Sequence, residues 1–122
     1  MAHVPRLRRT PEDALPPLQV RFTELRVEPW PGGRRIRVHI TLTPFQQNPN
    51  LDVALSDASG NEAGQVAIIE TAEHRIVFTM HIRSAQVTGP FTLTAHISYP
   101  EHGVVATQTI SFEIEPPSGG EI

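Results

Sequence analysis

Three histidines, His39, His81 and His96, occupy outward-facing positions of segments in which apolar and polar residues alternate. Imidazole nitrogens bind transition metals, but a site needs at least three ligands about 2 Å from the ion. If the segments of His39 and His81 pair, His81 lies opposite about Ile36, two or three residues from His39. The spacing therefore predicts solvent-facing histidines, and we expect no bound metal and no cofactor.

The segment from Asp57 to Glu62 has oxygen-bearing side chains at alternate positions, as calcium loops do. Calcium takes six to eight oxygen ligands, including several carboxylates. This segment offers only the carboxylates of Asp57 and Glu62, and Gly60 is misplaced for an EF-hand. We expect a hairpin turn in which Gly60 or Asn61 adopts a left-handed conformation.

Residues for catalysis are scarce. The chain has no cysteine, and its ten basic residues are all arginine, so thiol chemistry and lysine-dependent chemistry are excluded. No serine lies in a nucleophile motif, and Gly32-Gly33 precedes an expected strand rather than a helix that could hold phosphate. The acidic pairs Glu70/Glu73 and Glu113/Glu115 are expected to be solvated. An enzyme is therefore not expected.

The alternation that positions these residues is clearest between His74 and Arg83. Its even-numbered residues from Ile76 to Ile82 are apolar and its odd-numbered residues are polar, with Val77 as the apolar exception. Period-two alternation is typical of a strand with one face in a core and one in water. We expect Phe78 and Met80 to point inward.

Seven segments of this kind are separated by turns rich in glycine, proline and asparagine. They are Leu18–Glu28, Arg34–Thr43, Leu51–Leu55, Val66–Glu70 (at a sheet edge), His74–Arg83, Phe91–Tyr99 and Val104–Glu115. The apolar phase of the first segment changes at Thr23-Glu24, which predicts a β-bulge. Strands at this spacing, without a helical segment, predict an all-β fold, a seven-stranded antiparallel two-sheet sandwich.

Over residues 18–115 the chain resembles the immunoglobulin-like, fibronectin-III-like superfold. The resemblance rests on the strand count, the broken first strand and the segment Gly89-Pro90-Phe91-Thr92-Leu93-Thr94-Ala95, which is similar to one that opens a strand in such domains. The chain lacks a cysteine pair and a tryptophan on its third strand, and Tyr99 ends its strand. The resemblance therefore implies an architecture and no activity. In that architecture the second and fifth strands are neighbours, and the sixth strand, with His96, lies in the other sheet.

Net charge is −3 with a pI near 6.0, so nucleic acid and anionic membrane are not expected as partners. No apolar run is long enough to span a membrane, and no secretory signal is recognisable, which favours the cytoplasm. We expect a flexible N-terminal arm over residues 1–17, rich in proline and arginine, one domain over residues 18–116 and a flexible tail over residues 117–122.

The strongest candidate surface is the outer side of the second and fifth strands. It is expected to gather Arg35, Arg37, His39, Thr41, Arg75, Thr79, His81 and Arg83, with Glu24 or Glu28 neutralising part of the charge. Guanidinium groups suit carboxylate and phosphate, so this face is either an anion-recognising docking surface or a solvated, ion-paired face. Trp30 and Phe45 are expected in exposed loops, where they suit a binding hot spot.

A second candidate surface is flat and uncharged. It comprises Thr92, Thr94, Thr107, Thr109 and Ser111 of the last two strands. The function predicted from these features is a non-catalytic interaction module that binds another protein, with a second copy of the chain as one candidate partner. The alternative is a sandwich that binds a carbohydrate or another small ligand through Trp30 and neighbouring loops.

Overall fold

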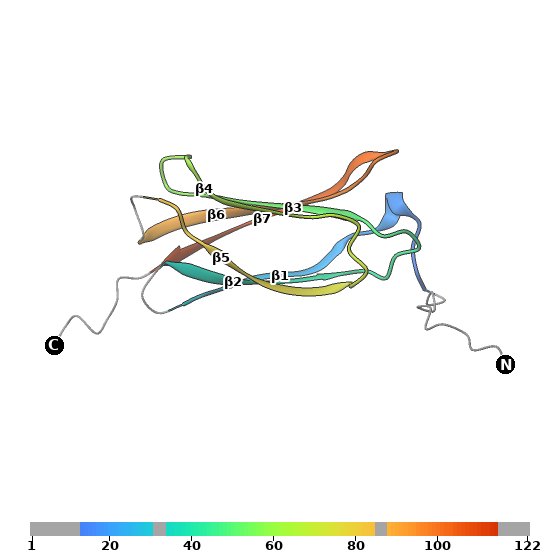
Figure 1. Ribbon diagram of the computed structural model, residues 1–122, viewed down its shortest axis with the longest axis horizontal. Helices are drawn as coiled ribbons and strands as arrows, with labels where there is room; N and C mark the ends of the chain where they lie inside the picture. Colours follow the sequence, from blue (N-terminus) through green and yellow to red (C-terminus); the bar gives the residue numbers. More distant parts are fainter. Residues whose placement is uncertain (1–12, 31–33, 85–87, 115–122) are drawn as a thin grey trace.

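The computed structural model describes residues 13–30, 34–84 and 88–114 (Figure 1). A single 3₁₀ turn, η1 (Pro17–Gln19), precedes the strands. The strands are β1 (Phe22–Pro29), β2 (Arg35–Leu42), β3 (Asn50–Ser56), β4 (Glu62–Ile68), β5 (Arg75–His81), β6 (Gly89–Tyr99) and β7 (Gly103–Ile114). Within this described part, no helix is long and apolar enough to cross a membrane.

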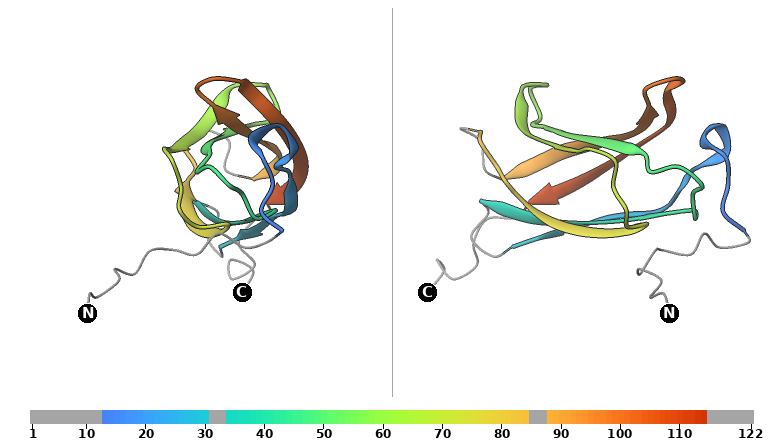
Figure 2. Two further views of the ribbon diagram at one scale, coloured as in Figure 1. Left: turned by 90° about the vertical axis from the view of Figure 1, so that its right-hand side faces the viewer. Right: turned by 45° about the vertical axis from the view of Figure 1, so that its right-hand side comes forward.

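The strands form two antiparallel sheets that face each other (Figures 1 and 2). One sheet has the order β1-β2-β5 and the other the order β4-β3-β6-β7. The seven-stranded antiparallel sandwich predicted from the sequence is therefore confirmed. The second and fifth strands are neighbours, and β4 lies at an edge, as expected.

The core lies between the sheets, where the alternating apolar residues meet. Ile36, Val38 and Ile40 of β2 are fully buried, and Met80 of β5 is 2% exposed. The facing sheet buries Leu51, Val53 and Leu55 of β3 and Phe91, Leu93, Ala95 and Ile97 of β6. Ile76 and Phe78 of β5 pack against this cluster but remain half-buried. The inward side predicted for β5 is thus confirmed.

The beginning of the domain differs from the prediction. The segment Leu18–Val20 was expected to be strand, but Pro16 and Pro17 lead into η1, because proline lacks the N–H that a ladder needs. Leu18 is exposed while Val20 is fully buried. The predicted bulge is confirmed, since the register with β2 shifts between Phe22 and Glu24.

Part of the predicted N-terminal arm packs against the domain. The Leu15 N–H donates to the carbonyl of Pro44, and the Gln46 N–H donates to the carbonyl of Leu15. Ala14 and Pro17 are buried. The rest of the predicted arm, residues 1–12, lies outside the described residues, as does the predicted tail over residues 117–122.

β4 begins four residues earlier than predicted and ends two residues earlier, covering Glu62–Ile68 instead of Val66–Glu70. Ile69 is exposed, and Glu70 has φ of 50°, which ends the strand. The turn before β4 is the expected hairpin. Its Gly60 has φ of 85°, and the Asp57 carboxylate accepts hydrogen bonds from the backbone N–H groups of Ser59 and Asn61.

Candidate binding face

The outer side of the three-stranded sheet is organised in rows, because residues opposite one another in an antiparallel ladder share a face. We call this surface the outer face. Its rows are Glu24/Thr41/Arg75, Arg26/His39/Val77, Glu28/Arg37/Thr79 and Trp30/Arg35/His81. Trp30 completes the last row, since its backbone N–H donates to the Arg35 carbonyl. The structure therefore brings together six of the predicted site residues: Trp30, Arg35, Arg37, His39, Arg75 and His81.

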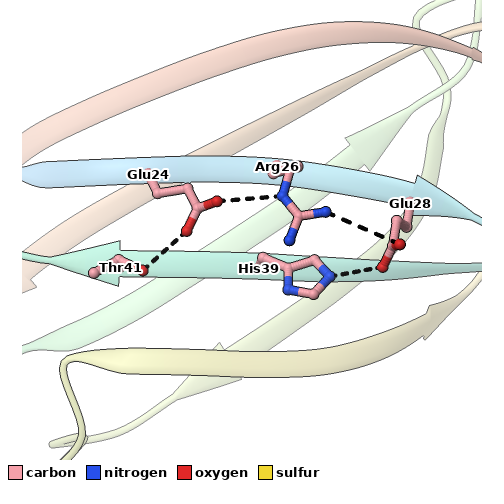
Figure 3. A network of polar contacts seen from close by, with 5 residues as sticks. All are labelled: Glu24, Arg26, Glu28, His39 and Thr41. Atoms are coloured by element: carbon pink, nitrogen blue, oxygen red, sulfur yellow. Dashed lines mark hydrogen bonds and ion pairs between the residues drawn. The ribbon is translucent and has the colours of Figure 1, made fainter.

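The carboxylates of β1 hold one part of the outer face in a network (Figure 3). Glu24 Oε2 lies 3.2 Å from Arg26 Nε, and the Thr41 hydroxyl donates to Glu24 Oε1 at 3.2 Å. Glu28 Oε1 lies 2.8 Å from His39 Nε2, and Glu28 Oε2 lies 4.0 Å from Arg26. We expected Glu24 or Glu28 to neutralise part of the charge of Arg35, Arg37, Arg75 and Arg83, but the ion-pair partners of the two carboxylates are Arg26 and His39.

These contacts lower the pKa of both carboxylates. The pKa of Glu24 is lowered mainly by hydrogen bonds from Arg26 and Thr41. The pKa of Glu28 is lowered mainly by the hydrogen bond with His39, against a smaller effect of desolvation. Both groups are therefore carboxylates at neutral pH, committed to partners within the sheet.

Trp30 and two arginines form a cluster at the end of the outer face. The guanidinium carbons of Arg35 and Arg37 lie 4.8 Å and 5.6 Å from the centre of the Trp30 ring. Both distances suit cation–π attraction, which orients a guanidinium while leaving N–H groups at its edge free. Trp30 is half-buried by this arrangement rather than fully exposed as expected.

Three arginines of the outer face are not committed to a carboxylate. Among the described residues, no carboxylate lies within ion-pair distance of Arg35, Arg37 or Arg75. Arg75 borders a shallow depression shared with Glu24, Arg26 and Thr41. Val77, which is 52% exposed, lies one row away. At both of its ends the face thus offers guanidinium groups that no described carboxylate pairs with, and an apolar side chain lies between them.

Two predicted site residues lie elsewhere. Arg83 follows the end of β5, and its backbone N–H donates to the Ala63 carbonyl of β4 at 2.7 Å, so Arg83 borders the groove between β4 and β5. Phe45 pairs with Leu15 in an isolated parallel bridge and packs against the core. Phe45 is therefore partly buried, not exposed in a loop as we expected.

The histidines do not gather. His39 is opposite Val77 and His81 is opposite Arg35, so the two lie two rows apart on the outer face. His96 belongs to the other sheet, where its Nδ1 lies 2.9 Å from the Thr107 hydroxyl. In the part of the chain that the structure describes, no group of three histidine or acidic residues could hold a metal ion.

Arg26 was missed as a member of the outer face. It lies two residues from both Glu24 and Glu28 on β1 and therefore shares their side of the strand. This parity was available from the sequence once the bulge at Thr23 had fixed the phase of β1.

The threonine-rich surface lies on the opposite side of the molecule, over β6 and β7. Its side chains pair across the ladder, with the Thr94 and Thr109 hydroxyl oxygens 3.2 Å apart. Thr107 is likewise bonded to the neighbouring His96, whose Nδ1 lies 2.9 Å from its hydroxyl oxygen. These polar groups are used within the sheet, and the surface offers a partner less unused hydrogen-bonding capacity than the outer face does.

No protein-family model and no curated protein sequence matches this chain. Solved structures with a similar fold include three glycosidases. The β-glucuronidase of Bifidobacterium dentium matches with a TM-score of 0.62 at 12% identity, over 78% of this chain and 17% of that one. The β-glucuronidase of Lactobacillus rhamnosus matches with a TM-score of 0.54 at 17% identity, over 79% of this chain and 16% of that one. A glycosyl hydrolase family 2 member from Bacteroides cellulosilyticus matches with a TM-score of 0.58 at 9% identity, over 78% of this chain and 15% of that one.

These matches concern one segment of much longer proteins, since this chain spans about a sixth of their length. At such low identity the likeness shows the fold alone. The strand order and these neighbours together identify the fold of this chain as an immunoglobulin-like β-sandwich.

Proposed function

We propose that this chain is a non-catalytic binding module whose outer face docks an acidic segment of another protein. The observation that carries the proposal is that Arg35, Arg37 and Arg75 lie on one sheet face and that no carboxylate of the described residues forms an ion pair with them. A guanidinium fork binds a carboxylate through two parallel N–H donors, which gives geometric specificity as well as attraction.

The arrangement of the face supports a protein partner. The Trp30 ring holds Arg35 and Arg37 in place, so less conformational entropy is lost when a carboxylate binds them. Val77 adds an exposed apolar contact between the charged ends. Aromatic and arginine side chains of this kind are enriched among the residues that dominate binding energy at protein interfaces.

The comparisons are consistent with a module that serves a larger assembly. A sandwich of this fold occupies only 15–17% of the three glycosidases described above. No described cluster of acidic and histidine side chains could hold a metal ion, and the acidic side chains of the outer face are engaged in the sheet. Carbohydrate binding through Trp30 is the weaker alternative, because two guanidinium groups already lie over its ring.

Equilibrium binding of fluorescent poly-glutamate and poly-glutamine peptides tests the proposal. Poly-glutamate should bind with an affinity that falls as salt is added, and poly-glutamine should not bind. Arg37→Gln should weaken binding of poly-glutamate about tenfold, the loss expected for one charge-assisted contact. The matched control Arg83→Gln makes the same charge change outside the outer face and should bind as wild type does.

Equal loss in the two variants would mean attraction by net charge alone and would refute a defined docking face. Equal binding of the two peptides would refute recognition of acidic groups. A saccharide panel read by thermal shift addresses the alternative, which predicts a stabilising sugar and loss of that effect in Trp30→Ala.

A further inference from the structure

The three-stranded sheet ends at β5, and its register with β2 shows which β5 backbone groups are free. The Leu42 N–H donates to the His74 carbonyl, and the Ile82 N–H donates to the Arg34 carbonyl. Because bonded pairs alternate in an antiparallel ladder, even-numbered residues of β5 bond to β2 and odd-numbered residues direct their N–H and C=O groups away from it. Arg83 agrees with this phase, since its N–H donates in the opposite direction, to β4.

The free part of the edge comprises Arg75, Val77 and Thr79, which we call the open edge. Within the described residues, their outward N–H and C=O groups have no ladder partner. The edge closes at His81, because β4 approaches there. A Cβ added to Gly64 would lie only 3.2 Å from the His81 carbonyl oxygen.

β5 is the edge strand with an unbroken register. The other three edge strands each carry one extra residue relative to their neighbours, namely Thr23 in β1, Ala63 in β4 and Val105 in β7. Bulges of this kind twist an edge and discourage further strand pairing. β5 has neither a bulge nor a proline nor an inward-pointing charge, so its edge is not protected by these devices.

Apolar surface remains uncovered on both sides of the open edge. Val77 is 52% exposed on the outer face. On the inner side, Ile76 and Phe78 are only half-buried, whereas their neighbours Ile40 and Val38 on β2 are fully buried. An additional strand beside β5 would cover apolar atoms on both faces as well as pair the free backbone groups.

We propose that β5 pairs with β5 of a second copy of this chain, antiparallel and centred on Val77. In this register the two Val77 side chains meet, Arg75 of each copy lies opposite Thr79 of the other, and Ile76 lies opposite Phe78. All free N–H and C=O groups of both open edges are then paired. The result is one continuous sheet in which the two outer faces lie side by side.

The charges favour this register. The two Arg75 side chains are four residues apart along the strand direction, about 14 Å, which exceeds the screening length of about 10 Å at 0.1 M salt. Glu73 of one copy lies across from His81 of the other. Centring the pair on Thr79 would place Arg75 opposite Arg83, and centring it on Arg75 would bring the two Arg75 residues together, so both shifts juxtapose like charges.

Sedimentation equilibrium of the full chain tests the proposal with a matched pair of variants. Wild type should dimerise with a mass that falls on dilution. Val77→Lys places two ammonium groups together at the centre of the interface and should be monomeric with an unchanged circular dichroism spectrum. Val104→Lys is the control, because Val104 is a 57% exposed valine on the edge strand β7, and this variant should still dimerise.

Cross-linking gives a second measurement, because the chain has no cysteine of its own. Directly opposed residues in a bonded pair have Cα atoms about 5.5 Å apart, within the range of a disulfide. Val77→Cys should therefore oxidise to a covalent dimer, and Val104→Cys should not. A monomeric wild type up to about 1 mM, a dimeric Val77→Lys or equal cross-linking of both cysteine variants would overturn the proposal. Arg37→Gln should leave the dimer intact, which separates this inference from peptide binding by the outer face.

Discussion

Glu28 lies directly opposite Arg37 in the ladder of β1 and β2, yet its carboxylate bonds His39 one row away, at 2.8 Å. The contact is diagonal, and it leaves the Arg37 guanidinium to lie over Trp30 at 5.6 Å. Because Glu28 bonds His39, the Arg37 guanidinium of the outer face remains without a carboxylate partner among the described residues. Had Glu28 paired with Arg37, this arginine would be neutralised within the sheet.

Replacing Glu28 by Gln should lower stability in a pH-dependent way. The pKa of Glu28 is lower in the folded protein than in the unfolded chain, chiefly because of the hydrogen bond with His39. The carboxylate therefore adds stability above about pH 4.3, the pKa of an unfolded glutamate, and this contribution is lost as the pH falls through the lower folded value. Urea unfolding at pH 7 should show Glu28→Gln as the less stable protein.

At a pH below both pKa values the two proteins should have equal stability. Glu113→Gln on β7 is the control, because Glu113 has no ion pair among the described residues. A difference between wild type and Glu28→Gln that persists unchanged in acid would contradict an ionic role for Glu28.

Tyr99 should titrate late. It is the only tyrosine of the chain, and burial raises its pKa to about 12. An unfolded tyrosine ionises near pH 10, so the folded protein retains a proton between about pH 10 and 12 that the unfolded chain loses. Stability should therefore fall as the pH rises through this window. Ultraviolet titration of tyrosinate absorbance should show no ionisation near pH 10 while the protein stays folded.

The hydroxyl of Tyr99 also holds a loop. It donates to the Gln47 carbonyl at 2.9 Å. Tyr99→Phe should lower the free energy of unfolding by about 1 kcal/mol at neutral pH, the net contribution of one such hydrogen bond. It should also abolish the alkaline loss of stability assigned to this residue, and a wild-type alkaline profile in the variant would assign that loss to another group.

Met80→Ala should lower the free energy of unfolding by about 2–5 kcal/mol, because Met80 is 2% exposed in the core and truncation leaves a cavity. Gln108→Ala on β7 is the control, because the Gln108 side chain is exposed, and it should change stability by less than about 0.5 kcal/mol. Chemical denaturation measures both. Near-wild-type stability of Met80→Ala would contradict the inward position of the even-numbered residues of β5.

Gly64→Ala should destabilise the contact between β4 and β5. The added methyl group would lie 3.2 Å from the His81 carbonyl oxygen and 3.3 Å from Met80 Cε. Because neighbouring atoms must shift to make room, Gly64→Ala should lower the free energy of unfolding by about 1–3 kcal/mol. The adjacent Gln65 is exposed, so the control Gln65→Ala should be nearly neutral. Amide hydrogen exchange should report faster opening of Arg83, whose N–H bonds Ala63. An unchanged exchange rate of the Arg83 amide would show that the close contact of Gly64 with β5 does not stabilise the bond between Arg83 and Ala63.

The sequence predicted the fold correctly where the polarity of each residue matches the side of the strand on which it lies, core or solvent. Strict alternation located β2, β5 and β6, and the change of phase at Thr23 located the bulge. The beginning of β4 could not be found this way, because Ala63 and Gly64 carry little hydrophobic signal. Ala63 is nevertheless fully buried, and Gly64 is needed where β5 comes close.

The candidate site was only partly predictable for a similar reason. Strand parity placed Arg35, Arg37 and Arg75 on one face, which the register confirms. Parity does not say which carboxylate an arginine meets, so the commitment of Glu28 to His39 could not be foreseen. Nor does it say where a chain leaves a sheet, and Arg83 lies beyond that point, with its backbone N–H bonded to Ala63 of β4.

Amide chemical-shift mapping with poly-glutamate tests the central claim, that the outer face is a docking surface. The account predicts shifts concentrated on the rows that contain Arg35, Arg37 and Arg75, with small changes over the threonine-rich side of β6 and β7. Shifts centred on β6 and β7, or spread evenly over all arginines including Arg21 and Arg83, would contradict it.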